Sequence, residues 1–239
     1  MSLMFSIVTV TFNSAKTLEQ TIKSVLSQGY TDFEYIIVDG ASTDGTLDII
    51  KRYASSDSRI KYISEPDGGI YEAMNKGISM STGEVVALLN SDDYYEPNAL
   101  ESVANYIPNV DSYVVYGVVR FLEGNSETWI ARNNHNSIPH RMVYHPGCFV
   151  SKNIYMKYRY DEKYKSAADY DLFIKLFQDK DVLFIPINDV LVNFRLGGMS
   201  STARGLLETN DIRYKYGFIS RRRYLRSKIW IKIKRMIVK

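Results

Sequence analysis

The chain has 239 residues, of which 45% are hydrophobic, 24% charged and 13% aromatic. This composition excludes a disordered or fibrous protein, and the length allows one large hydrophobic core. The formal net charge of +3 is unevenly distributed, because residues 221–239 hold nine Lys and Arg and no acid, whereas residues 1–220 hold 21 basic and 27 acidic residues, a net charge of −6. We therefore predict a mildly acidic globular body that ends in a cationic tail.

The single cysteine, Cys148, excludes an intramolecular disulfide and fits a reducing compartment. The N-terminus lacks the basic and small-residue pattern of a secretory signal, and no stretch approaches the roughly 20 apolar residues that span a bilayer. We expect a cytoplasmic protein that meets a membrane, if at all, at the surface.

In chain order, the first half alternates apolar, β-branched runs with segments of helical periodicity. Strands are predicted over residues 7–11, 34–38, 60–63 and 85–89. Helices are predicted to follow them over residues 18–26, 47–53, 71–78 and 97–104, with Asn13 and Ser14 as candidate caps of the first. Because these strands are uninterrupted apolar runs, the predicted fold class is α/β, with a Rossmann-like, mostly parallel central sheet flanked by helices on both faces.

The second half of the chain is less regular. Strands are predicted over residues 114–119 and 182–185, and a helix begins near Asp169, whereas residues 123–143 are polar and show no clear period. Residues 225–237 place apolar side chains at helical spacing among basic ones, which predicts a basic amphipathic helix at the C-terminus.

Polar side chains follow the predicted strands where each strand ends. They are Thr11, Asp39, Asp67 and the pair Asp92 and Asp93. Because ligands of parallel sheets bind outside the carboxyl ends of the strands, we expect the fold to gather these side chains into one crevice.

The strongest local signal is the pair of carboxylates at Asp92 and Asp93. Mg²⁺ and Mn²⁺ prefer oxygen ligands, often one or two carboxylates completed by phosphate oxygens, so the pair predicts a site for a metal-bound diphosphate. The alternative is an acidic turn before the helix that Pro97 begins. Asp39 and the turn after it suit contact with a base or ribose, or supply turn and capping chemistry alone. Neither a dinucleotide dehydrogenase nor a phosphate-loop NTPase is supported, because both glycine-rich signatures are missing from the sequence.

Five segments, taken together and in this order, resemble the inverting, nucleotide-sugar-dependent glycosyltransferases of family two, which have the GT-A fold, and specifically small bacterial members that build cell-surface polysaccharides. The segments are residues 8–13, 38–46, 65–77, 83–93 and 168–172. The resemblance spans residues 5–201. It implies a catalytic domain over residues 1–203, with a nucleotide-binding half (1–100) and an acceptor-side half (101–203), followed by a helical basic tail (204–239).

The resemblance also implies roles for the residues at the strand ends. Thr11 and Phe12 would line the base pocket, Asp39 would hydrogen-bond the base, and Asp67 would lie near the ribose or base. Asp93 would be the direct ligand of Mn²⁺ or Mg²⁺, and Asp92 would lie nearer the ribose or sugar. Asn90 stands where a first Asp often occurs in the family, so the metal would have fewer carboxylate ligands than the commonest pattern provides.

For catalysis, Asp169 matches the Asp of the family's Glu-Asp motif, which acts as general base toward the acceptor hydroxyl, although Ala168 replaces the Glu. The base role is compatible with a role as a helix cap. His145 resembles a segment that borders the acceptor and donor-sugar pocket, the alternative being a structural histidine. Arg195 would reach the diphosphate from a glycine-rich loop, or would form a surface ion pair.

The cationic tail, residues 221–239, predicts contact with an anionic membrane surface, since similar enzymes often use lipid-linked acceptors. Its alternatives are a helix packed on the catalytic domain or a nucleic-acid-binding tail, and we expect no nucleic-acid partner. The sequence thus predicts a metal-dependent inverting glycosyltransferase at the cytoplasmic face of a membrane, which uses a nucleoside diphosphate sugar, with UDP expected, and a glycan or lipid-linked acceptor. The alternatives are a nucleotidyltransferase that makes nucleotide sugars and a catalytically inactive nucleotide-sugar or polyanion-binding protein.

Overall fold

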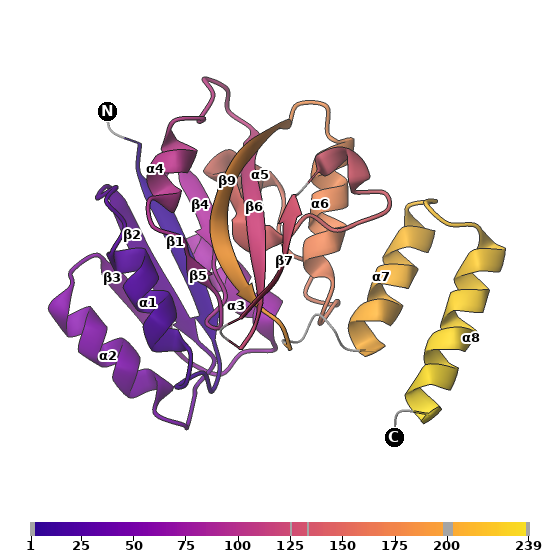
Figure 1. The fold of residues 1–239 in the computed structure, drawn as a ribbon, viewed down its shortest axis with the longest axis horizontal. Helices are drawn as coiled ribbons and strands as arrows, with labels where there is room; N and C mark the ends of the chain where they lie inside the picture. The colour runs from indigo at the N-terminus through magenta and orange to yellow at the C-terminus, as the bar shows by residue number, and fades with distance from the viewer. Residues whose placement is uncertain (1–2, 125, 133, 198–202, 238–239) are drawn as a thin grey trace.

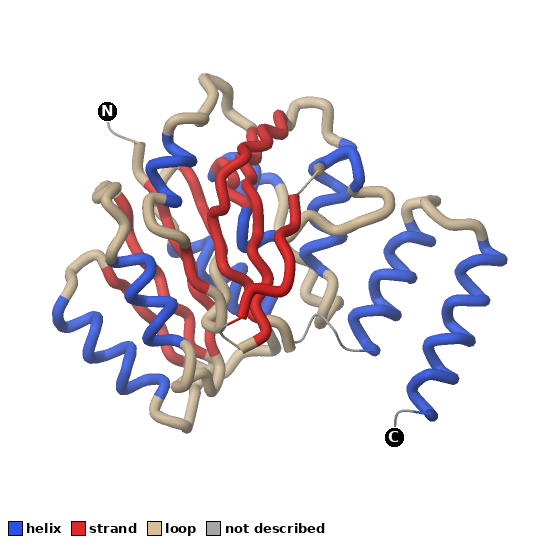
Figure 2. Tube along the Cα trace, in the orientation of Figure 1, coloured by secondary structure: helices blue, strands red, loops and turns tan. Residues whose placement is uncertain are grey.

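The structure, a computed structural model, describes residues 3–124, 126–132, 134–197 and 203–237. Its centre is a nine-stranded sheet in the order β3-β2-β1-β4-β8-β6-β9-β5, with β7 paired to β6. The strands are β1 (Phe5–Thr11), β2 (Phe33–Asp39), β3 (Ile60–Ser64), β4 (Val85–Leu88), β5 (Tyr94–Tyr95), β6 (Tyr113–Glu123), β7 (Ser126–Arg132), β8 (Cys148–Ser151) and β9 (Leu183–Arg195). Figure 2 shows this sheet between layers of helices.

Helices cover both faces of the sheet, and each face has its own hydrophobic core. They are α1 (Leu18–Leu26), α2 (Thr46–Ser56), α3 (Ile70–Met80), α4 (Ala99–Ala104), α5 (Lys152–Lys157), α6 (Ala168–Gln178), α7 (Ala203–Lys215) and α8 (Arg221–Ile237), with short 3₁₀ turns η1 (His135–Ser137) and η2 (His145–Gly147). Buried residues of α1, α2 and α4 form one core, and those of α3, α5 and α6 form the other. The predicted α/β class with helices on both faces is confirmed (Figure 1).

The direction of the strands differs in part from the expectation. Strands β3, β2, β1 and β4 are mutually parallel, as predicted. Strand β8 runs antiparallel to both β4 and β6, and β5 runs antiparallel to β9. The polar stretch 123–143 contains β7, which pairs antiparallel with β6. An apolar strand covered on both faces has the same composition in either direction, so composition did not reveal these reversals.

The start of α1 also differs from the expectation. The N-cap residue is Thr17 rather than Asn13 or Ser14. Asn13 has a positive φ of 50° and connects two strand-end loops, because its amide N–H donates to Oγ of Ser42 at 2.7 Å and its Oδ1 accepts from the N–H of Thr43 at 2.9 Å. Asn13 therefore joins the two loops, and α1 begins only after Thr17.

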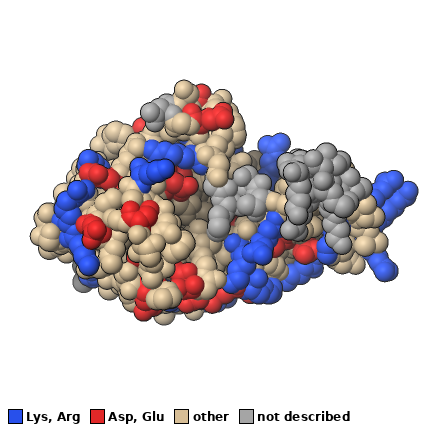
Figure 3. Space-filling model, turned by 90° about the horizontal axis from the view of Figure 1, so that it is seen from below, with Lys and Arg blue, Asp and Glu red and all other residues tan. Residues whose placement is uncertain are grey.

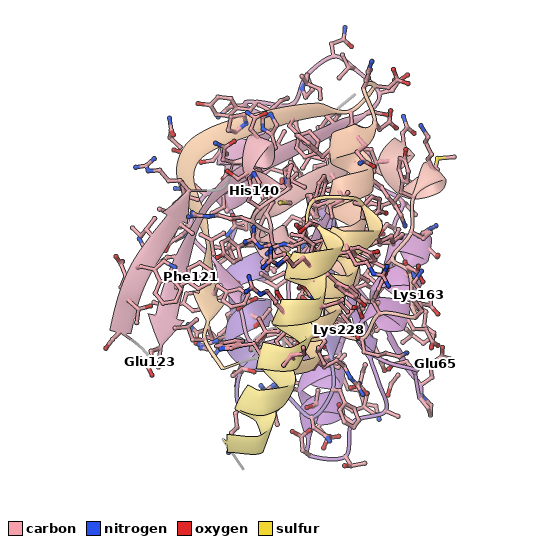
Figure 4. The ribbon with its side chains drawn as sticks, turned by 90° about the vertical axis from the view of Figure 1, so that its right-hand side faces the viewer. Glu65, Phe121, Glu123, His140, Lys163 and Lys228 are labelled. Atoms are coloured by element: carbon pink, nitrogen blue, oxygen red, sulfur yellow. The ribbon has the colours of Figure 1, made fainter. Side chains whose placement is uncertain are left out.

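Helices α7 and α8 form a hairpin beside α6 (Figures 1 and 4). Asp171 of α6 is fully buried and binds Lys215 of α7 at 2.7 Å, while the rings of Tyr214 and Tyr224 stack between α7 and α8 with centroids 4.4 Å apart. Lys228 of α8, labelled in Figure 4, forms an ion pair with Asp211 of α7 at 3.1 Å. The C-terminal region is therefore anchored to α6 through the buried Asp171, and its two helices are joined by an aromatic contact and an ion pair.

The surface reproduces the charge asymmetry of the sequence. Seen from below, the end of the molecule formed by α8 shows blue basic side chains, whereas red acidic and blue basic side chains are interspersed over the body (Figure 3). Within the described ranges, the structure contains no helix with both the length and the apolar character needed to cross a membrane.

Candidate active site

A cavity of about 750 Å³ opens at the carboxyl ends of β1 and β4. Six of the predicted site residues line it, namely Thr11, Phe12, Asp67, Asp92, His145 and Asp169. The other three, Asp39, Asp93 and Arg195, do not belong to its lining. The fold thus brings residues more than 150 positions apart in the sequence to one cavity. Six of the candidates line this cavity, and the other three do not.

The residues after β1 present groups that suit a nucleoside. Phe12 is 63% exposed although it is a large aromatic residue, and its ring borders the cavity. Oγ1 of Thr11 is buried and has no hydrogen-bond partner in the described part of the chain. Asp67 accepts a bond from the N–H of Gly69 at 2.9 Å, and its carboxylate lies against Gly40, where a Cβ would come within 2.9 Å of Oδ2. A stacking surface, a free hydroxyl and a carboxylate therefore border the same cavity.

Asp39 lies beneath this region and is fully buried. Its Oδ2 accepts from the N–H of Ser42 at 3.1 Å and from the hydroxyl of Ser64 at 2.6 Å, and its Oδ1 accepts from the hydroxyl of Ser42 at 2.5 Å. In this structure the carboxylate holds the two neighbouring loops with three hydrogen bonds, which leaves about one lone-pair position of Oδ1 unused, and the predicted contact with a base stays a prediction.

The turn after β4 separates the two adjacent carboxylates. Asp92 lines the cavity, whereas Asp93 is fully buried and accepts from the N–H of Arg195 at 3.0 Å and from Nδ2 of Asn90 at 3.3 Å. Burial raises the pKa of Asp92, and burial together with the neighbouring Asp92 charge raises that of Asp93 well above its usual range. Asp93 was expected to be the metal ligand. Because Asp92 lines the cavity and Asp93 does not, the geometry favours Asp92 as the carboxylate that would meet a metal there.

The oxygen atoms of this turn fit a hard divalent cation. Asn90 belongs to the lining of the cavity, and its Oδ1 is buried and finds no hydrogen-bond donor among the described residues. Together with Asp92 it offers the carbonyl and carboxylate oxygens that Mg²⁺ and Mn²⁺ prefer. The part of the chain that the structure describes contains no group of three or more His, Cys, Asp or Glu that could hold a metal. Further ligands would thus have to come from a diphosphate and water.

Arg195 supports this turn from behind. Its guanidinium donates to the backbone oxygen of Asp92 and to Oε1 of Gln20, and it lies 5.1 Å from the centroid of the Tyr94 ring. Within the described residues, it forms a hydrogen bond to the main chain instead of the alternative surface ion pair, and the predicted diphosphate contact stays a prediction. Of the glycine-rich loop that was expected to carry it over the donor, residues 198–202 lie outside the described residues.

Asp169 lies in the first turn of α6 and is 8% exposed. Its Oδ1 accepts from the hydroxyl of Tyr71 at 3.0 Å and from the N–H of Tyr170 at 2.9 Å, and its Oδ2 lies 3.2 Å from Nδ1 of His145. Burial, and then the charge of Asp169, raise the pKa of Tyr71, so that Tyr71 stays a neutral donor. The carboxylate is thus held on both oxygens at the wall of the cavity.

Sequence reasoning missed the partners of these residues. Tyr71 belongs to the 65–77 segment that was singled out, but only the packing of α3 against α6 shows that it meets Asp169. Gly205 and Thr209 of α7 also line the cavity, although α7 was assigned to the tail. Helix α7 is therefore part of the cavity wall.

Comparisons with known proteins place the chain in a family. The sequence model described as "Glycosyl transferase family 2" matches residues 6–182. The chain is 32% identical over 204 residues to the PGL/p-HBAD biosynthesis glycosyltransferase Rv2957 of Mycobacterium tuberculosis, a match that covers 83% of this chain and 80% of that protein.

Solved structures share the fold. S. aureus TarS 1–349 in complex with UDP-GlcNAc superposes with a TM-score of 0.71 at 21% identity, covering 88% of this chain and 65% of that one. The mannosyltransferase PcManGT from Pyrobaculum calidifontis, in complex with GDP-Man and Mn²⁺, superposes with a TM-score of 0.66 at 17% identity, covering 95% and 69%.

Proposed function

The chain belongs to glycosyl transferase family 2 and is a glycosyltransferase, and from this we propose that it is a metal-dependent, inverting enzyme whose donor is a nucleoside diphosphate sugar. We propose UDP as the carrier nucleotide, a glycan or lipid-linked glycan as acceptor, and a role in cell-surface polysaccharide biosynthesis. TarS, which shares the fold, binds UDP-GlcNAc, and PcManGT binds GDP-Man with Mn²⁺.

One observation supports the proposal above the others: a single cavity contains the exposed ring of Phe12, the carboxylate of Asp92 and the Asp169–His145 pair. Its volume of about 750 Å³ lies within the range of small-molecule sites. A nucleotidyltransferase would need a glycine-rich, basic phosphate-binding loop after β1, and the residues that follow Phe12 there, Asn13, Ser14, Ala15 and Lys16, contain no glycine and one basic residue.

The chemistry is a direct displacement at the anomeric carbon. The acceptor oxygen forms a bond to that carbon, the bond to the diphosphate breaks with its electron pair going to the diphosphate, and the acceptor proton passes to the carboxylate of Asp169. Asn90 and Asp92 would hold the divalent cation, which when bound offsets the negative charge of the departing diphosphate. Phe12 and Thr11 orient the nucleoside, and a single displacement inverts the configuration of the sugar.

A thermal-shift experiment with UDP, GDP and CDP, each with and without Mn²⁺, tests the nucleotide and metal parts. A diphosphate present at 100 times its Kd stabilises the native state by about 2.7 kcal/mol, which raises Tm by roughly 5–10 °C in a chain of this size. We expect Asp92→Asn to remove the Mn²⁺-dependent part of the shift. Asp48→Asn makes the same chemical change on exposed α2, outside the cavity, and should behave like the wild type.

The outcomes separate the alternatives. If none of the nucleotides raises the Tm of the wild type, with or without Mn²⁺, the donor assignment is contradicted. Binding without transfer from any nucleotide sugar would favour an inactive binding protein, and release of pyrophosphate from a nucleoside triphosphate would favour a nucleotidyltransferase.

We also propose that α8 contacts an anionic membrane surface at the cytoplasmic face. Leu225 and Ile229 are 48% and 60% exposed, and they share the outer surface of the helix with the exposed Arg222 and Arg226. Apolar and cationic side chains on one exposed helical face suit the interface of an anionic bilayer, where each Lys or Arg contributes about 1 kcal/mol.

Sedimentation with vesicles tests this contact in the full-length protein. We expect binding to vesicles that contain phosphatidylglycerol, weaker binding to pure phosphatidylcholine, and loss of binding in Arg222→Glu/Arg226→Glu. The control Lys51→Glu/Lys180→Glu changes the net charge equally at exposed sites elsewhere. Equal sedimentation of both double variants, or retention on RNA without vesicle binding, would rule out the membrane assignment.

A further inference from the structure

Helix α7 lies beyond the part of the chain that matches the family model, yet it belongs to the wall of the cavity. The match ends at residue 182, and α7 begins at Ala203. Gly205 and Thr209, one helical turn apart, both line the cavity. Ile212, almost one turn further along, is fully buried in the hydrophobic core that contains α6. One face of α7 is therefore directed at the catalytic domain.

Glu208, on the same face of α7, binds the turn that leads into α6. Its Oε2 accepts from the N–H of Ser166 at 2.8 Å, and both of its carboxylate oxygens lie 3.0 Å from the backbone nitrogen of Lys165. We refer to these bonds as the carboxylate clamp. The N-cap residue of α6 is Ala167, which has no side-chain oxygen to fix this turn from within. The turn is thus held by a residue more than 40 positions later in the chain.

Two more contacts connect α7 to the first turn of α6. Nε of Arg213 donates to the hydroxyl of Tyr170 at 3.2 Å, and Nζ of Lys215 donates to Oδ1 of Asp171 at 2.7 Å. Both contacts lie just after Asp169 in the sequence, whereas the carboxylate clamp lies just before it. Helix α7 therefore holds the chain on either side of Asp169.

We propose that Glu208 is a positioning residue of the transfer reaction, which holds the start of α6 so that the carboxylate of Asp169 meets the acceptor hydroxyl. The inference rests on the proposed function, in which Asp169 takes the acceptor proton. A general base acts only within hydrogen-bond reach of its proton, and a misplacement of about 1 Å can cost about 100-fold in rate. Thr11 and Phe12, which orient the nucleoside, follow from β1, so loss of the clamp should affect catalysis and leave donor binding unchanged.

Amide hydrogen exchange of the full-length protein tests the clamp without a substrate. The N–H groups of Lys165 and Ser166 donate to Glu208, so Glu208→Ala should speed their exchange by roughly 10-fold or more. The N–H of Tyr160, which donates to Oδ1 of Asn75 at 3.1 Å, is the internal control and should keep its exchange rate. Unchanged exchange at positions 165 and 166 overturns the proposal, whether or not the protein transfers sugar.

Transfer kinetics test the positioning role, with the UDP-sugar and acceptor that the wild type turns over. Glu208→Gln keeps one oxygen that can accept one of the two N–H groups, and we expect kcat to fall by about 3–10-fold. Glu208→Ala removes both oxygens, and we expect a fall of roughly 10–100-fold. The KM for the donor and the UDP-dependent thermal shift should stay at their wild-type values in both variants.

Glu123→Gln is the matched control. It makes the same chemical change at an exposed position of β6 outside the cavity, labelled in Figure 4, and should leave kcat unchanged. Thermal unfolding checks that each variant folds, and Glu208→Gln, which preserves the size of the side chain, decides the kinetic question if Glu208→Ala does not fold.

The outcomes separate the clamp from the proposed function. If folded Glu208 variants lose protection at positions 165 and 166 yet keep the wild-type kcat, the clamp does not position the base and the proposal fails. A fall in kcat together with loss of the UDP-dependent thermal shift also overturns it, because Glu208 then acts on donor binding. If the wild type transfers no sugar, or Asp169→Asn keeps full activity, the proposed function fails, and hydrogen exchange still decides whether Glu208 holds the turn.

Discussion

The close packing of α3 on the sheet makes Gly77→Ala a sensitive probe of both stability and activity. A Cβ at position 77 would lie 2.3 Å from Cγ1 of Val8 and 3.3 Å from Cγ2 of Val38, and both valines are buried in central strands. Overpacking a core costs about 1–3 kcal/mol, and the short contact places this site at the upper end. Alanine regains about 1 kcal/mol of helix propensity, so we expect a net loss of about 2 kcal/mol.

Denaturant unfolding measures this loss of unfolding free energy. Thermal unfolding should show a fall in Tm of about 4–8 °C. Because Tyr71 at the start of α3 holds Asp169, a displaced helix should lower kcat more than it changes KM. Ser79→Ala, at an exposed position of the same helix, should change stability by less than about 0.5 kcal/mol.

The double variant Val8→Ala/Gly77→Ala tests the cause directly, since Val8→Ala removes the methyl group that the new Cβ meets. Its destabilisation should be smaller than the sum of the two single effects by about 1–2 kcal/mol. Strict additivity, or a Gly77→Ala protein as stable as the wild type, would refute the packing argument.

Three further predictions follow from single side chains. Burial alone would raise the pKa of Glu34, but hydrogen bonds from Lys61, Ser6 and Thr82 outweigh it and hold the pKa at about 2, against the usual 4.5. The stabilisation that Glu34 contributes is therefore complete above pH 4.5 and is lost as pH falls toward 2. After discounting for the exposed Lys61, Glu34→Gln should remove about 1–2 kcal/mol of this acid-sensitive stability, and a pH-independent difference in urea unfolding would disprove the assignment. Asp171→Asn weakens the ion pair between the fully buried Asp171 and Lys215 and should cost about 3 kcal/mol in denaturant unfolding. Asp161→Asn, in a pair with the exposed Lys163, should cost less than about 1 kcal/mol, and equal losses would argue against a special role for the buried Asp171. Phe12→Ala should weaken UDP binding in calorimetry by roughly 10-fold at unchanged stability, because stacking on an aromatic ring contributes about 1–3 kcal/mol per base; an unchanged Kd would exclude stacking on Phe12.

The fold class followed from local patterns because β-branched runs and helical periodicity depend on short stretches of chain. The uninterrupted strands predicted β1, β2, β3 and β4 as parallel neighbours, and the structure pairs them so. The reversal of β8 and the strand β7 were not predicted, because pairing direction and the recruitment of a polar edge strand depend on distant partners.

The sequence by itself determined the chemistry available at the site: the residues after the strands, from Thr11 and Phe12 to Asp92 and Asp93, were identified from their types and places, and Asp169 and His145 from the resemblance to the family. Only the tertiary structure decided which of them face the cavity. Asp92 and Asp93 are adjacent in sequence, yet the turn exposes one to the cavity and buries the other, and the pairing of Asp169 with Tyr71 and His145 joins three elements up to 98 residues apart. A residue's chemistry is local, but its direction and its partners depend on how the helices pack against the sheet.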